Sequence, residues 1–527
     1  MQDNAEPKRV EGRRPGANRD ALRDAIAQEE ILLAKLEAEQ TESRHRLTVL
    51  RAELAALDIE PEIRVRLPVS LRVPIPQTSA DKVKLFRSLF RGREDVFPTR
   101  FVSAKTGKSG YAPACRNKFV RGVCELPKVK CGDCPNQAFI PFDDPAVVGH
   151  LTGRHVMGVY PLLADETCWF LAVDFDKSTW IDDVGAFVET CQHVGLPAAV
   201  ERSRSGNGAH VWFFFSTPVP AATARKMGCY LITETMSRRH ELSMESYDRL
   251  FPSQDTMPRG GFGNLIALPL QHGPRALGNS VFLDDQLRPY PDDQQWSYLA
   301  SLPRIDAATV ELIAREAADR ESVIGVSVAI IGDGDESIPW AQVPSRKRSP
   351  VIITEPLPKV VRAVLGQKLF IDKTGLPSPL INRIKRLAAF QNPEFYKRQS
   401  MRLSTAMTPR VIACAEDLPQ FVALPRGCQI EFEALLRDYG VPVEVEDQRI
   451  GGEPHGFQFQ GKLTSIQQAA ADALLAHDIG VLVAPPGMGK TVVGTYLVAA
   501  RGCSTLILVH RQPLLDQWLA QLSLFLG

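Results

Sequence analysis

Two aspartates at the end of an apolar segment are the first candidates for chemistry. Asp174 and Asp176 close the stretch 169–176, whose sequence WFLAVDFD is typical of a buried strand. Side chains alternate between the two faces of a strand, so both carboxylates are expected to point the same way. Like charges held this close repel each other, and Mg2+ or Mn2+, which prefer oxygen ligands, relieve the repulsion. Asp-x-Asp alone is a weak signal, because surface turns often contain it.

A glycine-containing turn follows the aspartates along the chain. Residues 201–215 have the sequence ERSRSGNGAHVWFFF. Gly206 and Gly208 permit a tight turn between two strands and let backbone N–H groups approach an anion. Arg202 and Arg204 would supply charge-assisted donors to a phosphate. The turn is therefore a candidate phosphate-binding site, although an ordinary β-hairpin has the same outline.

A histidine and a third acid extend this set. His210 opens the strand after the turn; a hydrogen-bonded histidine within a plain hairpin is the alternative interpretation. The stretch 246–255 ends on Asp255, which we expect, ahead of Asp248, to join the first two carboxylates. Three carboxylates beside a phosphate-binding turn are the parts that two-metal nucleotidyl transfer needs. One metal activates the attacking 3′-hydroxyl, and the other holds the triphosphate and steadies the leaving pyrophosphate.

A cluster of cysteines precedes the aspartates. Cys115, Cys124, Cys131 and Cys134 lie within 20 residues, and the last two form a CGDC knuckle that can direct two thiolates at one ion. In a reducing compartment such a cluster favours a metal over disulfides, and four thiolates make a closed, structural zinc site. The alternative is four reduced cysteines in a loop-rich segment.

A second candidate site lies near the C-terminal end. The apolar segment 480–483, predicted to be a strand, precedes the sequence APPGMGKT at 484–491, and a helical pattern follows. This is a P-loop, in which backbone N–H groups and a helix N-terminus cradle phosphates. Lys490 is expected to reach the β- and γ-phosphates, and Thr491 to bind magnesium.

The order of these motifs resembles the archaeo-eukaryotic primases, and residues 80–300 resemble more closely the primase domain of TOTE conflict systems. The matching stretches are 85–95, the cysteine cluster, 160–176, 201–210, 247–255 and 260–271. The resemblance implies an α+β primase-polymerase core with an RRM-like sheet and a zinc-binding insertion. It also implies roles for five residues, with metal binding at Asp174 and Asp176, a third acid at Asp255, and phosphate contacts from Ser205 and His210.

The resemblance further implies a template-directed nucleotidyltransferase that uses nucleoside triphosphates on a single-stranded DNA or RNA template, beside helicase or nuclease subunits. Two other readings remain open. One is a subunit of a defence complex that holds nucleic acid without synthesis, and the other is a subunit of an ATP-driven helicase. The intact aspartate pair favours synthesis, because a pure binding module has no need to hold like charges together.

The segment from residue 461 resembles the start of superfamily 2 helicases. The first glycine of the strict P-loop pattern is Ala484 here, an ordinary departure among those helicases, and 505–518 resembles their next motif, a strand and the start of a helix that touch DNA. No acidic DExx motif follows before Gly527, so we expect a truncated helicase start that does not hydrolyse ATP or unwind DNA by itself. The predicted ATP-binding residues, of which Gln467 matches the adenine-reading glutamine of these helicases, are Gln467, Gly487, Gly489, Lys490 and Thr491.

Composition sets the wider limits. The 527 residues suggest about three folded units. Apolar residues make up 44% and charged residues 23%, and the net charge of +1 gives no global basic field. No apolar run approaches the roughly 18 residues that span a bilayer, so we expect a cytoplasmic protein without a membrane segment.

A heptad pattern marks the N-terminal region. Leucine and isoleucine recur on a seven-residue repeat through 20–57, with polar residues interrupting the middle, which predicts a coiled-coil helix and possible self-association. A single helix packed on its own domain is the alternative. Basic and aromatic residues at 383–396 are candidates for holding a single strand, although an amphipathic helix with core aromatics is an equal alternative.

The predicted division of the chain gathers these features. It consists of a disordered start and coiled-coil helix at 1–60, a linker at 61–79, the primase domain at 80–305, a helix and linker at 306–355, an accessory α/β region at 356–455, and a partial α/β P-loop (RecA-like) lobe at 456–527.

Overall fold

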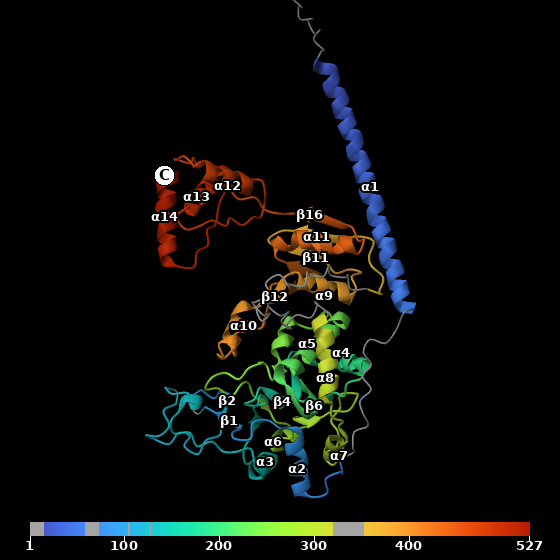
Figure 1. The fold of residues 1–527 in the computed structure, drawn as a ribbon, viewed down its shortest axis with the longest axis vertical. Coiled ribbons are helices and arrows are strands. Elements are labelled where there is room, and N and C mark those ends of the chain that lie inside the picture. Colours follow the sequence, from blue (N-terminus) through green and yellow to red (C-terminus); the bar gives the residue numbers. More distant parts are fainter. Residues whose placement is uncertain (1–14, 58–72, 104–105, 127, 320–352) are drawn as a thin grey trace, which may run out of the picture.

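A computed structural model describes residues 15–57, 73–103, 106–126, 128–319 and 353–527. The predicted disordered start and most of both predicted linkers lie outside these residues. The predicted N-terminal helix is confirmed as α1 (Pro15–Leu57), which runs beside the folded units in Figure 1. Its heptad side chains that the structure describes are exposed rather than packed on a domain, namely Leu22, Ile26, Leu33, Leu36, Leu47 and Leu50. The coiled coil itself stays a prediction.

The central unit is built on a five-stranded antiparallel sheet. Its long central strands are rich in aromatic and β-branched residues, which favour a pleated, buried surface. The strand order is β7-β4-β6-β5-β9. The strands are β4 (Thr167–Phe175), β5 (Ala199–Arg202), β6 (Ala209–Pro220), β7 (Leu250–Phe251) and β9 (Val281–Phe282).

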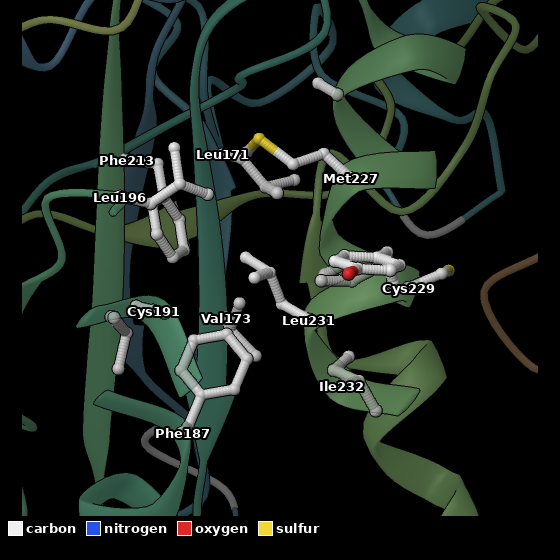
Figure 2. Packing of buried hydrophobic residues seen from close by; sticks show 14 of the residues in the cluster. Leu171, Val173, Phe187, Cys191, Leu196, Phe213, Met227, Cys229, Leu231 and Ile232 are labelled. Carbon is white, nitrogen blue, oxygen red and sulfur yellow. The ribbon is translucent and has the colours of Figure 1, made fainter. Parts of the chain in front are cut away.

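Both faces of this sheet are buried. On one face Leu171 and Val173 of β4 pack with Phe213 of β6 against two helices, as Figure 2 shows. On the other face Phe170 and Trp212 pack against a second group of helices. The helices of the first face are α4 (Trp180–Val194), α5 (Ala221–Arg238) and α8 (Ala307–Asp319), and those of the second are α2 (Ser79–Leu89), α3 (Asp144–Leu151) and α7 (Gln294–Ser301).

Helix α8 belongs to this core. Val310 and Ile313 are fully buried in the same cluster as the central strands. The predicted domain boundary at residue 305 placed this helix with the following linker instead. Its apolar stripe needs a partner surface, and α5 supplies one.

Smaller elements surround the sheet and include two short antiparallel pairs. The second-face core reaches one of these pairs through Val159 and Ile266. The elements are β1 (Pro98–Val102) with β2 (Ser109–Pro113), β3 (Gly158–Val159) with β8 (Ile266–Ala267), the 3-10 helices η1 (Cys131–Asp133) and η2 (Met244–Asp248), and α6 (His272–Arg275).

The accessory α/β region predicted at 356–455 forms a second sheet with its own core. The strand order is β14-β15-β11-β10-β16, and only the β10–β16 pair is parallel. The strands are β10 (Val361–Leu365), β11 (Leu369–Asp372), β14 (Glu416–Asp417), β15 (Phe421–Leu424) and β16 (Val443–Asp447), and the helices are α9 (Ser378–Arg386), η3 (Arg426–Cys428) and α11 (Gln429–Asp438).

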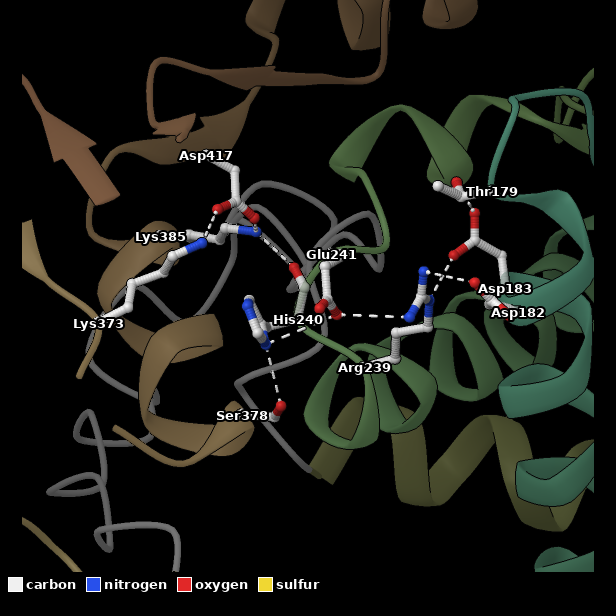
Figure 3. Close-up of polar contacts among 10 residues, drawn as sticks. All are labelled: Thr179, Asp182, Asp183, Arg239, His240, Glu241, Lys373, Ser378, Lys385 and Asp417. Carbon is white, nitrogen blue, oxygen red and sulfur yellow. Dashed lines mark hydrogen bonds and ion pairs between the residues drawn. The ribbon is translucent and has the colours of Figure 1, made fainter. Parts of the chain in front are cut away.

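The accessory region is joined to the central unit by polar contacts. Figure 3 shows Lys385 of α9 donating to the His240 carbonyl and pairing with Asp417. His240 Nδ1 lies 3.0 Å from the Ser378 hydroxyl, at the start of α9. The neighbouring Arg239 is held to α4, because its Nε donates to Asp183 at 2.7 Å.

A segment of the accessory region also enters the central core. It comprises β12 (Ala389–Gln391), α10 (Pro393–Ser400) and β13 (Val411–Ala413), whose Val411 joins the first-face cluster. Phe395 is 3% exposed, with the buried Arg410 guanidinium 4.1 Å above its ring. The aromatic residue Phe395 is therefore part of a core, as the alternative interpretation held, whereas Phe390 is exposed.

The C-terminal segment contains three helices, α12 (Ser465–Leu475), α13 (Lys490–Arg501) and α14 (Gln512–Leu526). The strand predicted at 480–483 and the one at the start of 505–518 are wrong for this structure. Val483 and Leu508 are 90% and 83% exposed, and neither segment pairs with another strand among the described residues. A strand of a parallel sheet is stable only between neighbours that cover its edges and faces. No helix of the described chain is long and apolar enough to cross a bilayer.

Candidate active site

The paired aspartates lie where β4 meets β6 at the open end of the sheet. Asp174 is opposite His210 in the antiparallel register, and its Oδ1 lies 3.7 Å from His210 Nε2. The side chains of Asp174 and Asp176 are 17% and 45% exposed. Burial raises the pKa of Asp174, the Asp176 charge raises it further, and the opposing His210 charge does not cancel these effects. A second negative charge at this end of β4 is therefore unfavourable unless a cation lies beside it.

An arginine that the sequence analysis did not single out lies between the two carboxylates. Arg249 Nη1 lies 3.4 Å from Asp174 Oδ2, and its Nη2 lies 2.8 Å from Asp176 Oδ2. The Asp174 amide also donates to the Arg249 carbonyl at 3.0 Å, which fixes the arginine just before β7. The available signal was a basic residue directly before the short apolar run Leu250–Phe251, in a stretch considered only for its acids.

A small cavity adjoins the pair. It has a volume of about 70 Å3, and its lining includes Asp174, Asp176, Lys177, Glu245 and Arg249. Lys177 and Glu245 pair with each other at 2.7 Å across the cavity wall. The carboxylates are thus open to solvent on the side that faces α4 and η2.

His210 is held by a buried glutamate. Glu201 of β5 is the cross-strand partner of His210, and its Oε2 lies 2.8 Å from His210 Nδ1 and accepts from Trp212 Nε1 at 3.1 Å. The Glu201 side chain is 2% exposed. Burial opposes a charge on His210, but Glu201 and Asp174 together outweigh burial and raise the pKa of the imidazole. An imidazole oriented by Glu201 therefore lies beside Asp174, and its protonated form is favoured relative to a free histidine. Glu201 is a second site residue that the sequence analysis missed.

The glycine turn packs directly on the end of β4. Gly206 has a φ of 79°, in the left-handed region that glycine adopts without strain. The turn closes through the Ser203 amide, which donates to the Gly208 carbonyl at 2.9 Å. A Cβ on Gly208 would lie 2.5 Å from the Phe175 carbonyl oxygen. The predicted tight turn is confirmed, and Ser205 is exposed at its tip, where its Oγ accepts from the Asn207 amide at 3.3 Å.

Replacement of Gly208 by alanine should therefore destabilise the central unit by about 1–3 kcal/mol, because the methyl group meets backbone that cannot yield. The matched change Gly185→Ala, in α4 where nothing lies within 4 Å of the new Cβ, should stabilise by about 0.5–1 kcal/mol. Urea unfolding of both variants measures the difference. Equal stabilities would show that the turn does not pack on β4 as described.

The two arginines of the turn have different surroundings. Arg202 Nη2 donates to the Leu287 carbonyl at 3.4 Å, which turns this side chain toward the β9 side of the sheet. Arg204 donates to the buried side chain of Gln271. Of the two arginines, it is therefore Arg204 whose position beside the turn is fixed by another side chain.

The structure does not bring the predicted third acid, Asp255, to the aspartate pair. Strand β7 runs antiparallel to β4, with Phe251 opposite Ala172, so the chain after Arg249 leads away from Asp174. Asp255 pairs with the buried Arg225 of α5 and accepts from Gln399 Nε2 at 2.9 Å. Asp248 accepts from the Arg410 amide at 2.8 Å and is likewise turned toward the accessory segment.

The four cysteines converge on one pocket. Cys115, Cys124, Cys131 and Cys134 all line a cavity of about 30 Å3. Burial raises the pKa of the Cys131 thiol, and the neighbouring thiols add to this effect. Within the described ranges, however, no three His, Cys, Asp or Glu side chains stand close enough to form a ready-made metal site. The four thiols nevertheless suit zinc in their chemistry and in lining one cavity.

The predicted ATP-binding residues gather around one loop. Gly487 and Gly489 have φ values of 84° and 81°, and Lys490 begins α13. Lys490 Nζ donates to the Ala484 carbonyl at 2.7 Å, and Gln467 Nε2 donates to the Met488 carbonyl at 2.9 Å. The loop thus has the turn and helix start that a phosphate needs.

Comparison with known proteins finds two families, each matching a separate part of the chain. Residues 81–313 match the family described as TOTE conflict system, Archaeo-Eukaryotic Primase domain, and residues 460–527 match Type III restriction enzyme, res subunit. The chain is 37% identical over 91 residues to the DNA 3'-5' helicase XPB of Mycobacterium tuberculosis, covering 17% of each chain. It is 36% identical over 87 residues to the putative DNA 3'-5' helicase Rad25 of Halobacterium salinarum, covering 16% of this chain and 14% of the relative. The match thus spans about a sixth of these relatives' length.

Proposed function

We propose that this chain, in which an archaeo-eukaryotic primase domain of the TOTE conflict-system family precedes a helicase-family segment, is a template-directed nucleotidyltransferase of an anti-element conflict system. The single observation that carries the proposal is the aspartate pair held by Arg249. Asp174 and Asp176 keep two like charges together at the open end of a buried sheet, which costs stability and is explained by cation binding.

The neighbouring side chains fit that chemistry. Asp174 and Asp176 would hold Mg2+ or Mn2+, which, when bound, supplies the charge that activates a 3′-hydroxyl and steadies pyrophosphate. His210 is oriented by Glu201, which also favours its protonated form, and its other ring nitrogen can donate to a phosphate oxygen. Ser205 is exposed at the tip of the turn for a second donor contact. Arg249 can release the carboxylates toward a metal and pair with phosphate instead.

Two further sites belong to the proposal. The four cysteines hold a structural Zn2+ that fixes the loops beside the sheet, and metal analysis of the purified chain tests this. The loop at 484–491 binds ATP, and the chain works beside helicase or nuclease subunits.

Helix α1 joins two copies of the chain through the exposed side chains at its heptad positions. Loss of a dimer on changing Leu33 and Leu36 to serine, measured by light scattering, would support that role of α1.

Nucleotide incorporation tests the proposed function directly. The chain should incorporate labelled nucleotides on a single-stranded DNA or RNA template with Mg2+ or Mn2+. EDTA should abolish the signal, and excess metal should restore it, because the carboxylate pair supplies oxygen ligands only. Tight template binding without incorporation under any metal would instead favour the non-synthesising, nucleic-acid-binding subunit.

A further inference from the structure

The β1–β2 hairpin lies beside the glycine turn of the active site. The Arg100 amide donates to the Val156 carbonyl at 2.8 Å. The next carbonyl, that of Met157, accepts from the Leu268 amide at 3.1 Å. Gln271 Nε2 donates to the Leu268 carbonyl at 3.0 Å, and its Oε1 accepts from Arg204. This chain of contacts leads from the hairpin to Arg204, directly before Ser205.

Two arginine charges act on each other at this junction. Burial and the neighbouring Arg100 charge both lower the pKa of Arg204. Neither Arg100 nor Arg204 pairs with a carboxylate in the part of the chain that the structure describes, whereas Arg249 nearby holds two. Two like charges without a neutralising acid raise the free energy of the fold, and a bound anion lowers it.

A tyrosine completes the group. Tyr111 of β2 is directly opposite Arg100 in the antiparallel register, so the two side chains share a face of the hairpin. Burial raises the pKa of Tyr111, which keeps its hydroxyl protonated as a donor. Gln271, 1% exposed, accepts a hydrogen bond from Arg204 and thereby orients it. The site is thus assembled from the hairpin and the turn.

We propose that Arg100, Tyr111 and Arg204 form a phosphate-binding site contributed jointly by the β1–β2 hairpin and the active-site turn. The site rests on the proposed function for its ligand, which is a phosphate of either the incoming nucleoside triphosphate or the template strand. The hairpin runs directly into the cysteine-bearing loops, since β2 ends at Pro113.

Equilibrium binding to Arg100→Gln separates the two sources of phosphate without requiring synthesis. One arm measures the Kd of a non-hydrolysable nucleoside triphosphate with Mg2+, and the other measures the Kd of a labelled single-stranded oligonucleotide across a salt series. If the site binds a phosphate of the nucleotide, the Kd of the nucleoside triphosphate should rise about tenfold, and the Kd of the oligonucleotide should not change. If it belongs to the strand, the strand Kd should rise, and the slope against log salt should flatten by about 0.7.

The controls keep these outcomes interpretable. Arg315→Gln removes the same charge from α8 on the opposite face of the sheet, where the arginine is 80% exposed, and should change neither Kd. Tyr111→Phe removes only a hydroxyl and should weaken the same ligand about threefold, which serves if Arg100→Gln fails to fold. Unchanged binding of both ligands by folded Arg100→Gln overturns the site. If Arg100→Gln weakens binding as expected but the wild-type chain incorporates no nucleotide, the phosphate-binding site is supported and only the proposed function is rejected.

Discussion

Asp174→Asn and Asp176→Asn are each expected to lower nucleotide incorporation by about 100- to 1,000-fold, the range typical of removing one charge that stabilises a transition state. Asparagine keeps the shape of the side chain but removes a charged oxygen ligand. Burial raises the pKa of Asp174, so the folded state already disfavours its charged form, and Asp174→Asn should not lower the unfolding midpoint. The measurement is primer extension on a single-stranded template, paired with a thermal melt of each variant.

A matched carboxylate provides the control for this loss. Asp285 is exposed in the turn after β9, and Asp285→Asn removes the same charge without touching the pair. Its incorporation rate should equal that of the wild type. Retention of at least half the activity in both Asp174→Asn and Asp176→Asn would show that the pair does not hold the reacting metal, and the nucleic-acid-binding alternative would then be favoured.

Asp255→Asn is expected to have the largest effect on stability, about 3–5 kcal/mol, because it leaves a buried cation without its countercharge. The Arg225 side chain is 4% exposed, and its Nε donates to Asp255 Oδ1 at 2.8 Å. Protein that remains folded at low temperature should still incorporate nucleotide, since Asp255 is not beside Asp174. Denaturant unfolding and primer extension on the same preparation separate these two effects.

The control for Asp255 is an exposed ion pair. Glu311 lies 3.6 Å from Arg315 on the surface of α8, and Glu311→Gln should cost only about 0.3–0.5 kcal/mol. If Asp255→Asn instead kept full stability and lost incorporation, the third-acid assignment from the sequence would be right and the placement of β7 wrong.

The same pair makes stability depend on acidic pH. Burial alone would raise the pKa of Asp255, but the Arg225 and Arg410 charges outweigh it and lower the pKa below the ordinary value of 3.8. A carboxyl with a depressed folded pKa stabilises the fold fully above its unfolded value, and the contribution declines as the pH falls through the folded pKa. Unfolding free energy should therefore fall below about pH 4 in the wild type, and this dependence should be weaker in Asp255→Asn.

Local sequence patterns determined the parts of the site that lie on one segment. Alternation of side chains along β4 predicted that Asp174 and Asp176 point the same way, and that Leu171 and Val173 point into the core. Gly206 in the active-site turn and Gly487 and Gly489 in the P-loop also have the positive φ angles that such tight turns require. Each of these features depends on backbone geometry within a few residues, so the sequence alone was sufficient.

Tertiary structure decided everything that depended on which segments meet. Arg249 and Glu201 became partners of the site through the antiparallel registers of β7 with β4 and of β5 with β6. Asp255 lies beside Arg225 instead, because the antiparallel pairing of β7 with β4 leads the chain away from Asp174. The apolar segment 480–483 likewise formed no strand, since a strand needs neighbours that no local pattern can provide. The sequence of β4 was sufficient to predict the aspartate pair. Strand pairing determined that Arg249 is its cationic partner and which acid, if any, lies third beside it.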